Sequence, residues 1–299
     1  MIYQYILRKA QDLNTISWGL NYWIFRGQTN SKWPLATKLE RVAKQFDNRS
    51  PNDLEWTALD QFMRQAHQYS SQLPAKEQRV DWLALMQHYG GPTRLLDFTK
   101  SFYVALFFAI ESGYAETEAA VYAFNESKLF EGLGKKLKDD TSLDGTLNYL
   151  RAHQRINKRK RHENCDLGLL PIMPHMMNDR QSLQQGVFLF PEELSHTTNF
   201  EDNLCAEFGI KKEDLSSLQP IEDTDFFKGL GNSTDDKLII KIIIPADSAM
   251  RSEIMAELYK MNISARTLFP GLDGLGRSLN FSKRWYDAIQ RISANDFTQ

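Results

Sequence analysis

Cysteine, net charge and metal-binding patterns are all scarce in this sequence. Its 299 residues include two cysteines, Cys165 and Cys205, and neither lies in a CxxC pair or in a cysteine–histidine cluster. This spacing excludes the common zinc sites, and nothing in it favours a disulfide between the two. The formal net charge is -2, so no overall charge draws the chain to nucleic acid or to a membrane. Any anion binding must therefore come from a local group of residues.

Long apolar runs and the common catalytic motifs are absent as well. No run approaches the roughly 18 residues of a membrane span, and the N-terminal stretch is too short and too charged for a secretory signal. We therefore expect a soluble, cytoplasmic protein with no membrane partner. The sequence also lacks a P-loop, a G-x-G-x-x-G fingerprint after a strand and a G-x-S-x-G elbow, so the most familiar nucleotide and hydrolase signatures do not apply.

Strand and helix patterns extend through the whole chain. Residues rich in aromatic and β-branched side chains predict strands at 21–26, 118–125 and 237–245. Apolar residues at helical spacing predict helices within 37–72, 81–87, 248–261 and 278–292. We expect a loop at 131–144 and an exposed insertion or lid at 201–236. Late strands that follow intervening helices favour an α+β fold with a mixed sheet.

The stretch 86–109 concentrates polar side chains next to an apolar run. Six polar or aromatic residues surround the turn signal Gly90-Gly91-Pro92, and the following YVALFFAI is apolar all round, as in a buried helix or strand. A polar turn held against a buried element is a typical way to present a site. The six residues are Gln87, His88, Tyr89, Arg94, Asp97 and Thr99.

A second candidate lies upstream, where the strand at 21–26 ends in Arg26-Gly27-Gln28. An arginine at the end of a buried strand is costly to desolvate without an anionic partner. That partner is either a protein carboxylate or a bound phosphate, and the sequence leaves both open. The glycine allows a sharp turn or a close approach of the backbone to a ligand.

Together the two stretches resemble the FRG domain, a bacterial and phage family named for its Phe-Arg-Gly motif. Phe25-Arg26-Gly27 matches that motif, and Trp33 and Leu35 follow at the usual places. The second motif matches from Gln87 to Ala109. The resemblance implies one domain over residues 1–299, with core motifs at 20–125 and 180–275 and helical insertions at 130–170 and 200–236.

A more distant resemblance is to arginine-type mono-ADP-ribosyltransferases. Phe25-Arg26-Gly27 looks like their NAD-holding strand end, and 98–109 looks like their central strand and following helix. This similarity implies an ADP-ribosyltransferase-like core and NAD as substrate, with Arg26 as anchor, Thr99 as its brace and Tyr89 stacking on the ligand. The implied catalytic set is Arg26, Tyr89, Asp97 and Thr99. The implied NAD-binding set is Arg26, Gly27, Gln28, His88, Tyr89, Arg94 and Gln185, with Arg180 facing the same cleft.

The transferases also need a glutamate on a late strand, and here the chain departs from their pattern. The corresponding segment offers Gln185 and Gly186, so Asp97, Glu192, Glu193 and Asp273 are the acids that remain. The resemblance therefore leaves three functions open. They are a transferase that modifies a nucleic acid or protein as a toxin or phage-defence effector, a non-catalytic binding module for a nucleotide, nucleic acid or protein, and an NAD glycohydrolase. A toxin would also bring an antitoxin or other regulator as a partner.

A basic run at 155–162 is the remaining candidate surface. Such a run is either a solvated helix face or a contact for phosphates of RNA or DNA. Its members are Arg155, Lys158, Arg159, Lys160, Arg161 and His162.

Overall fold

The computed structural model describes residues 2–47, 49–111, 116–137, 145–161, 163, 168–230 and 239–279. Its strands are β1 (Ile2–Ile6), β2 (Trp23–Gln28), β3 (Leu96–Thr99), β4 (Ala119–Asn125), β5 (Leu169–Ile172), β6 (Gly186–Pro191), β7 (Gln219–Pro220) and β8 (Ile239–Ile244). The helices of the first half are α1 (Asp12–Gly19), α2 (Lys38–Ala43), α3 (Pro51–Ala66), α4 (Arg79–His88), α5 (Phe102–Ile110), α6 (Glu126–Leu137) and α7 (Gly145–Lys158). Those of the second half are α8 (Asp179–Leu183), α9 (Phe200–Phe208), α10 (Asp225–Lys228), α11 (Ser248–Lys260), α12 (Ala265–Leu268) and α13 (Leu272–Ser278), with a 3₁₀ helix, η1, at Lys212–Leu215.

The strands form one eight-stranded mixed sheet in the order β5-β6-β3-β2-β4-β8-β1-β7. β2 lies near its centre and pairs antiparallel with both β3 and β4, with Phe25 opposite Thr99 and Arg26 opposite Tyr122. β1 is parallel to β7 and β8. Because strands far apart in sequence are neighbours and helices intervene, the predicted α+β class with a mixed sheet is confirmed.

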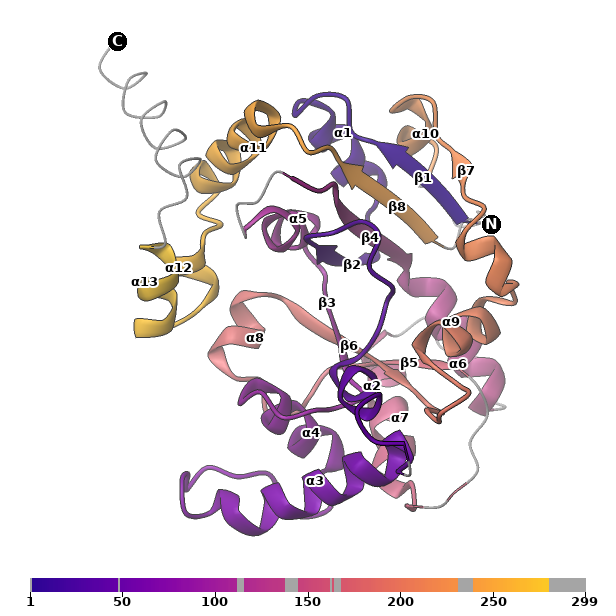
Figure 1. Ribbon diagram of the computed structural model, residues 1–299, viewed down its shortest axis with the longest axis vertical. Coiled ribbons are helices and arrows are strands. Elements are labelled where there is room, and N and C mark those ends of the chain that lie inside the picture. Colours follow the sequence, from indigo (N-terminus) through magenta and orange to yellow (C-terminus); the bar gives the residue numbers. More distant parts are fainter. Residues whose placement is uncertain are drawn as a thin grey trace.

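Helix α5 contains the apolar run YVALFFAI, and it packs on the sheet against β2 (Figure 1). Seven of its nine residues are buried, which explains why its sequence carries no polar face. The contact depends on Gly27, since a Cβ at that position would lie 2.0 Å from the carbonyl oxygen of Ala105. The close approach of α5 to β2 therefore requires a glycine at this position.

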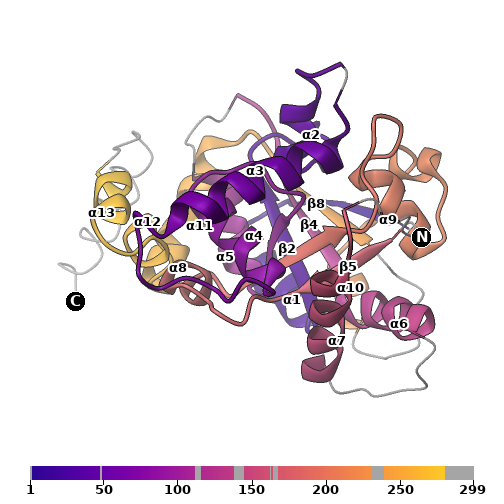
Figure 2. The same ribbon diagram turned by 90° about the horizontal axis from the view of Figure 1, so that it is seen from below.

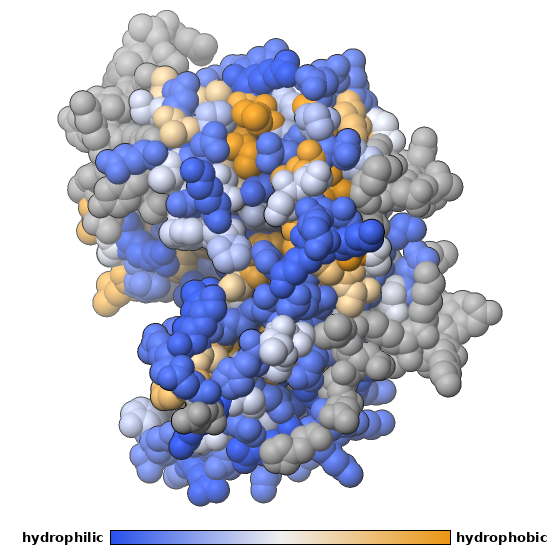
Figure 3. All heavy atoms as spheres, turned by 45° about the vertical axis from the view of Figure 1, so that its right-hand side comes forward, coloured by the Kyte–Doolittle hydropathy of each residue, from blue (hydrophilic) through white to orange (hydrophobic). Residues whose placement is uncertain are grey.

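A second apolar cluster joins α3, α4 and α7 to the other end of the sheet. Leu59, Leu83 and Ile156 are buried there with Phe188 and Phe190 of β6. Figure 1 shows α3 and α4 at the opposite end of the molecule from β1 and β8, and Figure 2 shows α3 lying across α4. In Figure 3 the surface at that end is almost entirely hydrophilic, whereas apolar side chains are interspersed farther up. A third buried cluster includes Ile24 of β2, Phe98 of β3 and Phe124 of β4.

Several predicted elements differ from the structure. The loop expected at 131–144 is wrong for its first part, because α6 continues to Leu137. The segment 201–236 is no simple exposed lid, since Phe200 and Leu204 of α9 are buried and β7 extends the sheet beside β1. Strand β1 was not expected. Residues 138–144, 231–238 and 280–292 lie outside the described residues, as do Cys165 and His162.

None of the helices in the described part of the chain is long and apolar enough to cross a membrane.

Candidate functional site

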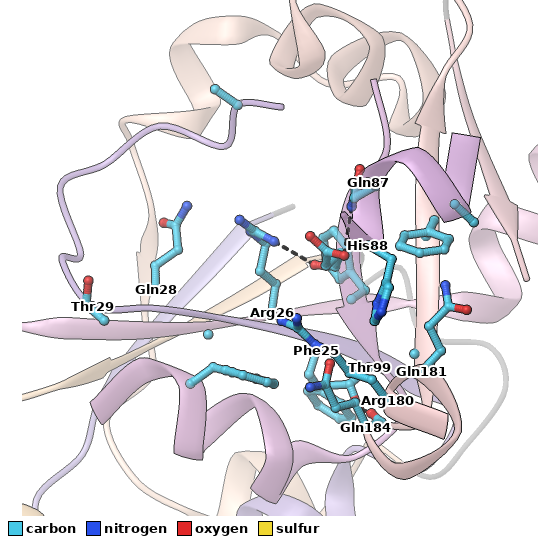
Figure 4. A pocket seen from close by; sticks show the side chains of 18 of the residues that line it. Phe25, Arg26, Gln28, Thr29, Gln87, His88, Thr99, Arg180, Gln181 and Gln184 are labelled. Atoms are coloured by element: carbon cyan, nitrogen blue, oxygen red, sulfur yellow. Dashed lines mark hydrogen bonds between the residues drawn. The ribbon is translucent and has the colours of Figure 1, made fainter. Parts of the chain in front are cut away.

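A pocket of about 840 Å³ opens beside the end of β2 (Figure 4). Its walls come from segments far apart in sequence: the end of β2 and the loop after it, α2, α4, β3, α8, the start of β6 and the segment 269–277. The polar side chains that line it are Arg26, Gln28, Thr29, Arg41, Lys44, Gln87, His88, Asp97, Thr99, Arg180, Gln181, Gln184 and Arg277. The aromatic ones are Phe25, Trp33, Phe98, Phe108, Phe188 and Phe269. Ligand pockets are commonly about 300–1,000 Å³, so this one suits a nucleotide-sized molecule.

Arg26 and Gln28 project from alternate positions of β2 and each carries a buried polar atom without a partner. The Nη1 of Arg26 donates to the backbone oxygen of Asp97 at 2.7 Å. Within the described residues, Nε of Arg26 and Oε1 of Gln28 have no hydrogen-bond partner. Burial lowers the pKa of Arg26, the charge of Asp97 opposes this, and the nearby Arg41 adds to it. Because buried polar atoms are almost always bonded, these two are suited to a ligand.

Asp97 is held at the pocket wall by a chain of amide and hydroxyl groups. Its Oδ1 accepts from Nε2 of Gln87 at 2.8 Å, and Oε1 of Gln87 accepts in turn from the hydroxyl of Thr93. These bonds fix which end of the Gln87 amide faces the carboxylate. Among the described residues, the second oxygen, Oδ2, has no hydrogen-bond partner. The carboxylate thus keeps one oxygen available for a ligand.

Two arginines and an aromatic ring form another part of the pocket wall. The guanidinium groups of Arg180 and Arg277 lie over the ring of Phe269, at 4.5 and 3.7 Å from its centroid. Arg277 is also paired with Glu111 at 3.3 Å. Burial lowers the pKa of Arg180, as does Arg277, against the opposing charge of Asp97. A guanidinium stacked on a ring in this way keeps its N–H edge available for an anion.

His88 lies at the end of α4, where its ring meets that of Tyr89 edge to face. Burial lowers the pKa of His88 and the charge of Arg180 lowers it further. The imidazole is therefore neutral at pH 7 and can exchange hydrogen bonds with a ligand without adding charge.

The charge balance of the lining is strongly positive. Five cationic side chains face the pocket, whereas Asp97 is the single carboxylate among the described lining residues. The five are Arg26, Arg41, Lys44, Arg180 and Arg277. Cations gathered in a concave, partly desolvated site favour an anionic ligand, and guanidinium groups match phosphate in particular. The described residues contain no group of His, Cys, Asp and Glu side chains that could hold a metal ion.

Most of the sequence-predicted residues lie in this pocket, although one has a different role. Arg26, Gly27, Gln28, His88, Asp97, Thr99 and Arg180 line it. Thr99, however, does not brace Arg26. Its hydroxyl donates to the backbone oxygen of Gln184 at 2.6 Å and accepts from the amide of Ser101. Thr99 therefore fastens the α8–β6 turn to β3.

Three predicted residues lie outside the pocket. Arg94 is fully buried beneath it, where its Nε pairs with Glu55 at 2.7 Å, so it stabilises the fold and has no ligand to reach. Tyr89 is 70% exposed on the outer surface. Gln185 is exposed and adopts a left-handed backbone with φ of 49°, and its neighbours Gln184 and Gly186 line the pocket instead.

Two of the other predicted acids, Glu192 and Glu193, lie against the basic run, whereas Asp273 is outside the pocket lining and its charge opposes the lowering by burial of the pKa of His88 and of Arg180. Glu192 is buried and pairs with Arg155 at 2.7 Å, and Glu193 lies 3.9 Å from Arg159. Arg161 pairs with Asp53 at 3.3 Å. Lys158 and Lys160 are exposed. The run is therefore mostly an internal brace of α7 against β6 and α3.

Sequence reasoning missed the contributions of Arg41, Lys44, Arg277 and Phe269. Each lies on a short helix or beside one. Arg41 and Lys44 fall within the predicted core motif 20–125 and Phe269 within 180–275, but none of them was named as a site residue, and Arg277 lies outside both motifs. Which cations meet across the pocket depends on the packing of α2 and α13.

The fold and pocket define an α+β protein with an electropositive, nucleotide-sized site. The family model for the FRG domain matches residues 21–118, and that range includes Arg26, Gln28, Gln87, His88 and Asp97. Searches of curated proteins and of solved structures returned no match. The FRG resemblance is thus supported over this part of the chain, and the comparisons give no support to the ADP-ribosyltransferase resemblance.

Proposed function

We propose that the pocket binds NAD through its phosphates and that the protein is an ADP-ribosyltransferase-like enzyme. The observation that carries the proposal is the cluster of five cations around one carboxylate, in a pocket of nucleotide size. The buried, unpartnered Nε of Arg26 supports it, because a phosphate oxygen supplies the missing acceptor.

Asp97 is the residue suited to support the chemical step. In ADP-ribosyl transfer the bond between ribose C1′ and nicotinamide nitrogen breaks, and nicotinamide leaves with the bonding electrons. Positive charge then develops on the ribose, where a fixed carboxylate lowers its energy. A nucleophile of the acceptor adds to C1′ and loses its proton. Oδ2 of Asp97 is available for the ribose because Gln87 occupies only Oδ1. A role as toxin or phage-defence effector, under a regulator, would follow from this activity.

The experiment is NAD binding and nicotinamide release by the purified protein and three variants. Arg26→Ala removes a charge-assisted contact, so we expect about tenfold weaker NAD binding or more, measured by calorimetry. Asp97→Asn should bind NAD and release little nicotinamide, since it keeps the shape and loses the charge. Arg64→Ala serves as a matched control, because Arg64 lies on the outer face of α3 in an exposed ion pair. NAD affinity in Arg26→Ala equal to that of wild type would refute the role of Arg26.

A non-catalytic nucleotide-binding module is the second candidate, and one observation favours it. The transferases carry a glutamate on their late strand, whereas here Gly186 and Phe188 are the β6 residues that line the pocket. Glu192 and Glu193 are engaged with arginines. Such a module binds NAD and releases no nicotinamide under any condition. An NAD glycohydrolase, in contrast, releases nicotinamide in buffer alone, whereas a transferase depends on added acceptor.

A further inference from the structure

The loop after β2 and helix α2 carry a row of cations next to the pocket. Lys38, Arg41 and Lys44 occupy positions i, i+3 and i+6 and are all exposed, so they share one side of the helix. Leu39, Glu40 and Ala43 on the other side are buried. Lys32 and the half-exposed Trp33 precede them in the loop. We call these five residues, Lys32, Trp33, Lys38, Arg41 and Lys44, the α2 surface.

The charges of the α2 surface are not balanced by carboxylates. Lys38 donates to the backbone oxygen of Gly90, and Arg41 donates to that of Ala36 at 2.7 Å. Within the described part of the chain, none of its four cations has an ion-pair partner. The nearest acid in sequence, Glu40, points inward and accepts from the amides of Thr37 and Phe200. Arg41 also lies close enough to Arg26 to lower the pKa of Arg26.

Position links this surface to the pocket and leaves it accessible. Trp33, Arg41 and Lys44 line the pocket, so the cations continue from the outer surface to Arg26. Figure 2 shows α2 at the outer edge of the molecule, where a long ligand can reach it. The exposed indole adds a flat apolar face among the cations.

We propose that the α2 surface binds single-stranded nucleic acid and leads a nucleotide of that strand into the pocket. Cations in a row track phosphates, and an exposed tryptophan among them stacks on an unpaired base. A duplex has no unstacked base that could stack on the indole of Trp33, and an acidic peptide has no base at all. The bound strand would be the acceptor in the proposed ADP-ribosyl transfer, and this role of the strand rests on the proposed function. Binding of the strand itself needs no NAD.

The α2 surface replaces the basic run at 155–162 as the favoured contact for RNA or DNA. In that run Arg155, Arg159 and Arg161 already face carboxylates, and Arg159 is buried. Lys158 and Lys160 are exposed there and provide a matched pair for a control.

The test is fluorescence anisotropy with a fluorescein-labelled single strand of about 12 nucleotides, as RNA and as DNA. The variant Lys32→Gln/Lys44→Gln removes two cations without bonds to other described residues. If each contacts one phosphate, the salt slope falls by about 1.4 and binding weakens about 25-fold at roughly 0.1 M salt. Trp33→Ala should weaken binding about tenfold or more. The control Lys158→Gln/Lys160→Gln removes the same charge and should bind as wild type does.

Four results would overturn the inference. They are no binding by wild type, an equal loss in the control, full binding by Trp33→Ala, or equal competition by a duplex or by poly-glutamate. Each protein is first checked for an unchanged melting temperature, and wild type is tested for NAD binding by calorimetry. Strand binding without NAD binding would support the α2 surface as a nucleic-acid site and refute the proposed function. NAD binding without strand binding would support NAD binding by the pocket and refute the α2 surface as a nucleic-acid site.

Discussion

The most consequential single residue outside the pocket is Glu55, which neutralises two buried arginines. Its carboxylate pairs with Nε of Arg94 at 2.7 Å and with Nη2 of Arg79 at 3.1 Å. Burial by itself raises the pKa of Glu55, but the two arginines outweigh it and hold that pKa below its usual range. Burial lowers the pKa of Arg79 to about 9 although the charge of Glu55 opposes this, and the guanidinium lies 3.9 Å from the ring centre of Trp56. Arg94, although it lies in the second sequence motif, therefore stabilises the fold through its ion pair with Glu55.

We expect Glu55→Gln to lower the free energy of unfolding by about 3–5 kcal/mol, because it leaves two guanidinium groups buried without a counter-charge. The pKa of Glu55 is depressed on folding, so its contribution is present above the unfolded-state value of about 4.3 and disappears as pH falls through the lower folded-state value. Urea unfolding from pH 7 to pH 3 measures this. The gap between the unfolding free energies of wild type and variant should narrow as pH falls below about 4.3, and a gap that is constant with pH would contradict the assignment.

The matched control for this measurement is Asp60→Asn. Asp60 pairs with Arg64 at 3.0 Å, and both side chains are more than half exposed. An exposed pair contributes about 0–1 kcal/mol, so this variant should unfold almost as wild type does.

At the scale of elements, the contact between β2 and α5 determines where Arg26 lies. A Cβ on Gly27 would come within 2.0 Å of the oxygen of Ala105 and 2.6 Å of the amide nitrogen of Ala109, both backbone atoms. Gly27→Ala must therefore push α5 away from the sheet. We expect a loss of about 1–3 kcal/mol in the free energy of unfolding.

Gly276, in α13, is the comparison position, because a Cβ there would meet no atom within 4 Å. Gly276→Ala should raise the free energy of unfolding by about 0.5–1 kcal/mol. Thermal unfolding of both variants gives the comparison, and a neutral Gly27→Ala would show that the helix does not sit so close.

Sequence patterns were a good guide to elements with strong periodicity. The aromatic strand before Arg26, the β-branched run in β8 and the helix α11 were all expected close to their observed bounds. Strand β1 was missed because its sequence, IYQYI, does not alternate clearly between apolar and polar residues. Its burial comes from pairing with β7 and β8, which lie far along the chain. For α6, the glycines and lysines of its sequence suggested a loop, and packing against β5 and α7 overrode that propensity.

The site was predictable only where a motif marked it. Arg26, His88 and Asp97 lie in motifs that concentrate unusual side chains, and they line the pocket. Arg94 belongs to the second motif, like His88 and Asp97, but it is fully buried outside the pocket. The sequence could not predict this, because residue type does not reveal to which side of a turn an arginine side chain points. Arg277 joins the pocket from the far end of the chain, through tertiary packing that no local pattern encodes.

At the scale of the whole molecule, the matched range 21–118 contains too little to form either the sheet or the pocket. Strand β4 pairs along six residues with β8, and β3 pairs along four with β6. Both partners lie beyond residue 118, as do Arg180, Phe269 and Arg277 of the pocket wall. The core around α5 likewise needs Ile240, Ile242 and Ile254.

We therefore expect a protein truncated after residue 125 to lack a cooperative unfolding transition. Without β6 and β8, strands β3 and β4 become exposed edges, and the core around α5 loses Ile240, Ile242 and Ile254. Circular dichroism and tryptophan fluorescence in increasing urea measure this, with the full chain in the same buffer as reference. A sharp transition in the truncated protein would mean that the matched range folds by itself. The second half would then be an addition to a complete domain, and the pocket would be a site between two folding units rather than a product of one sheet.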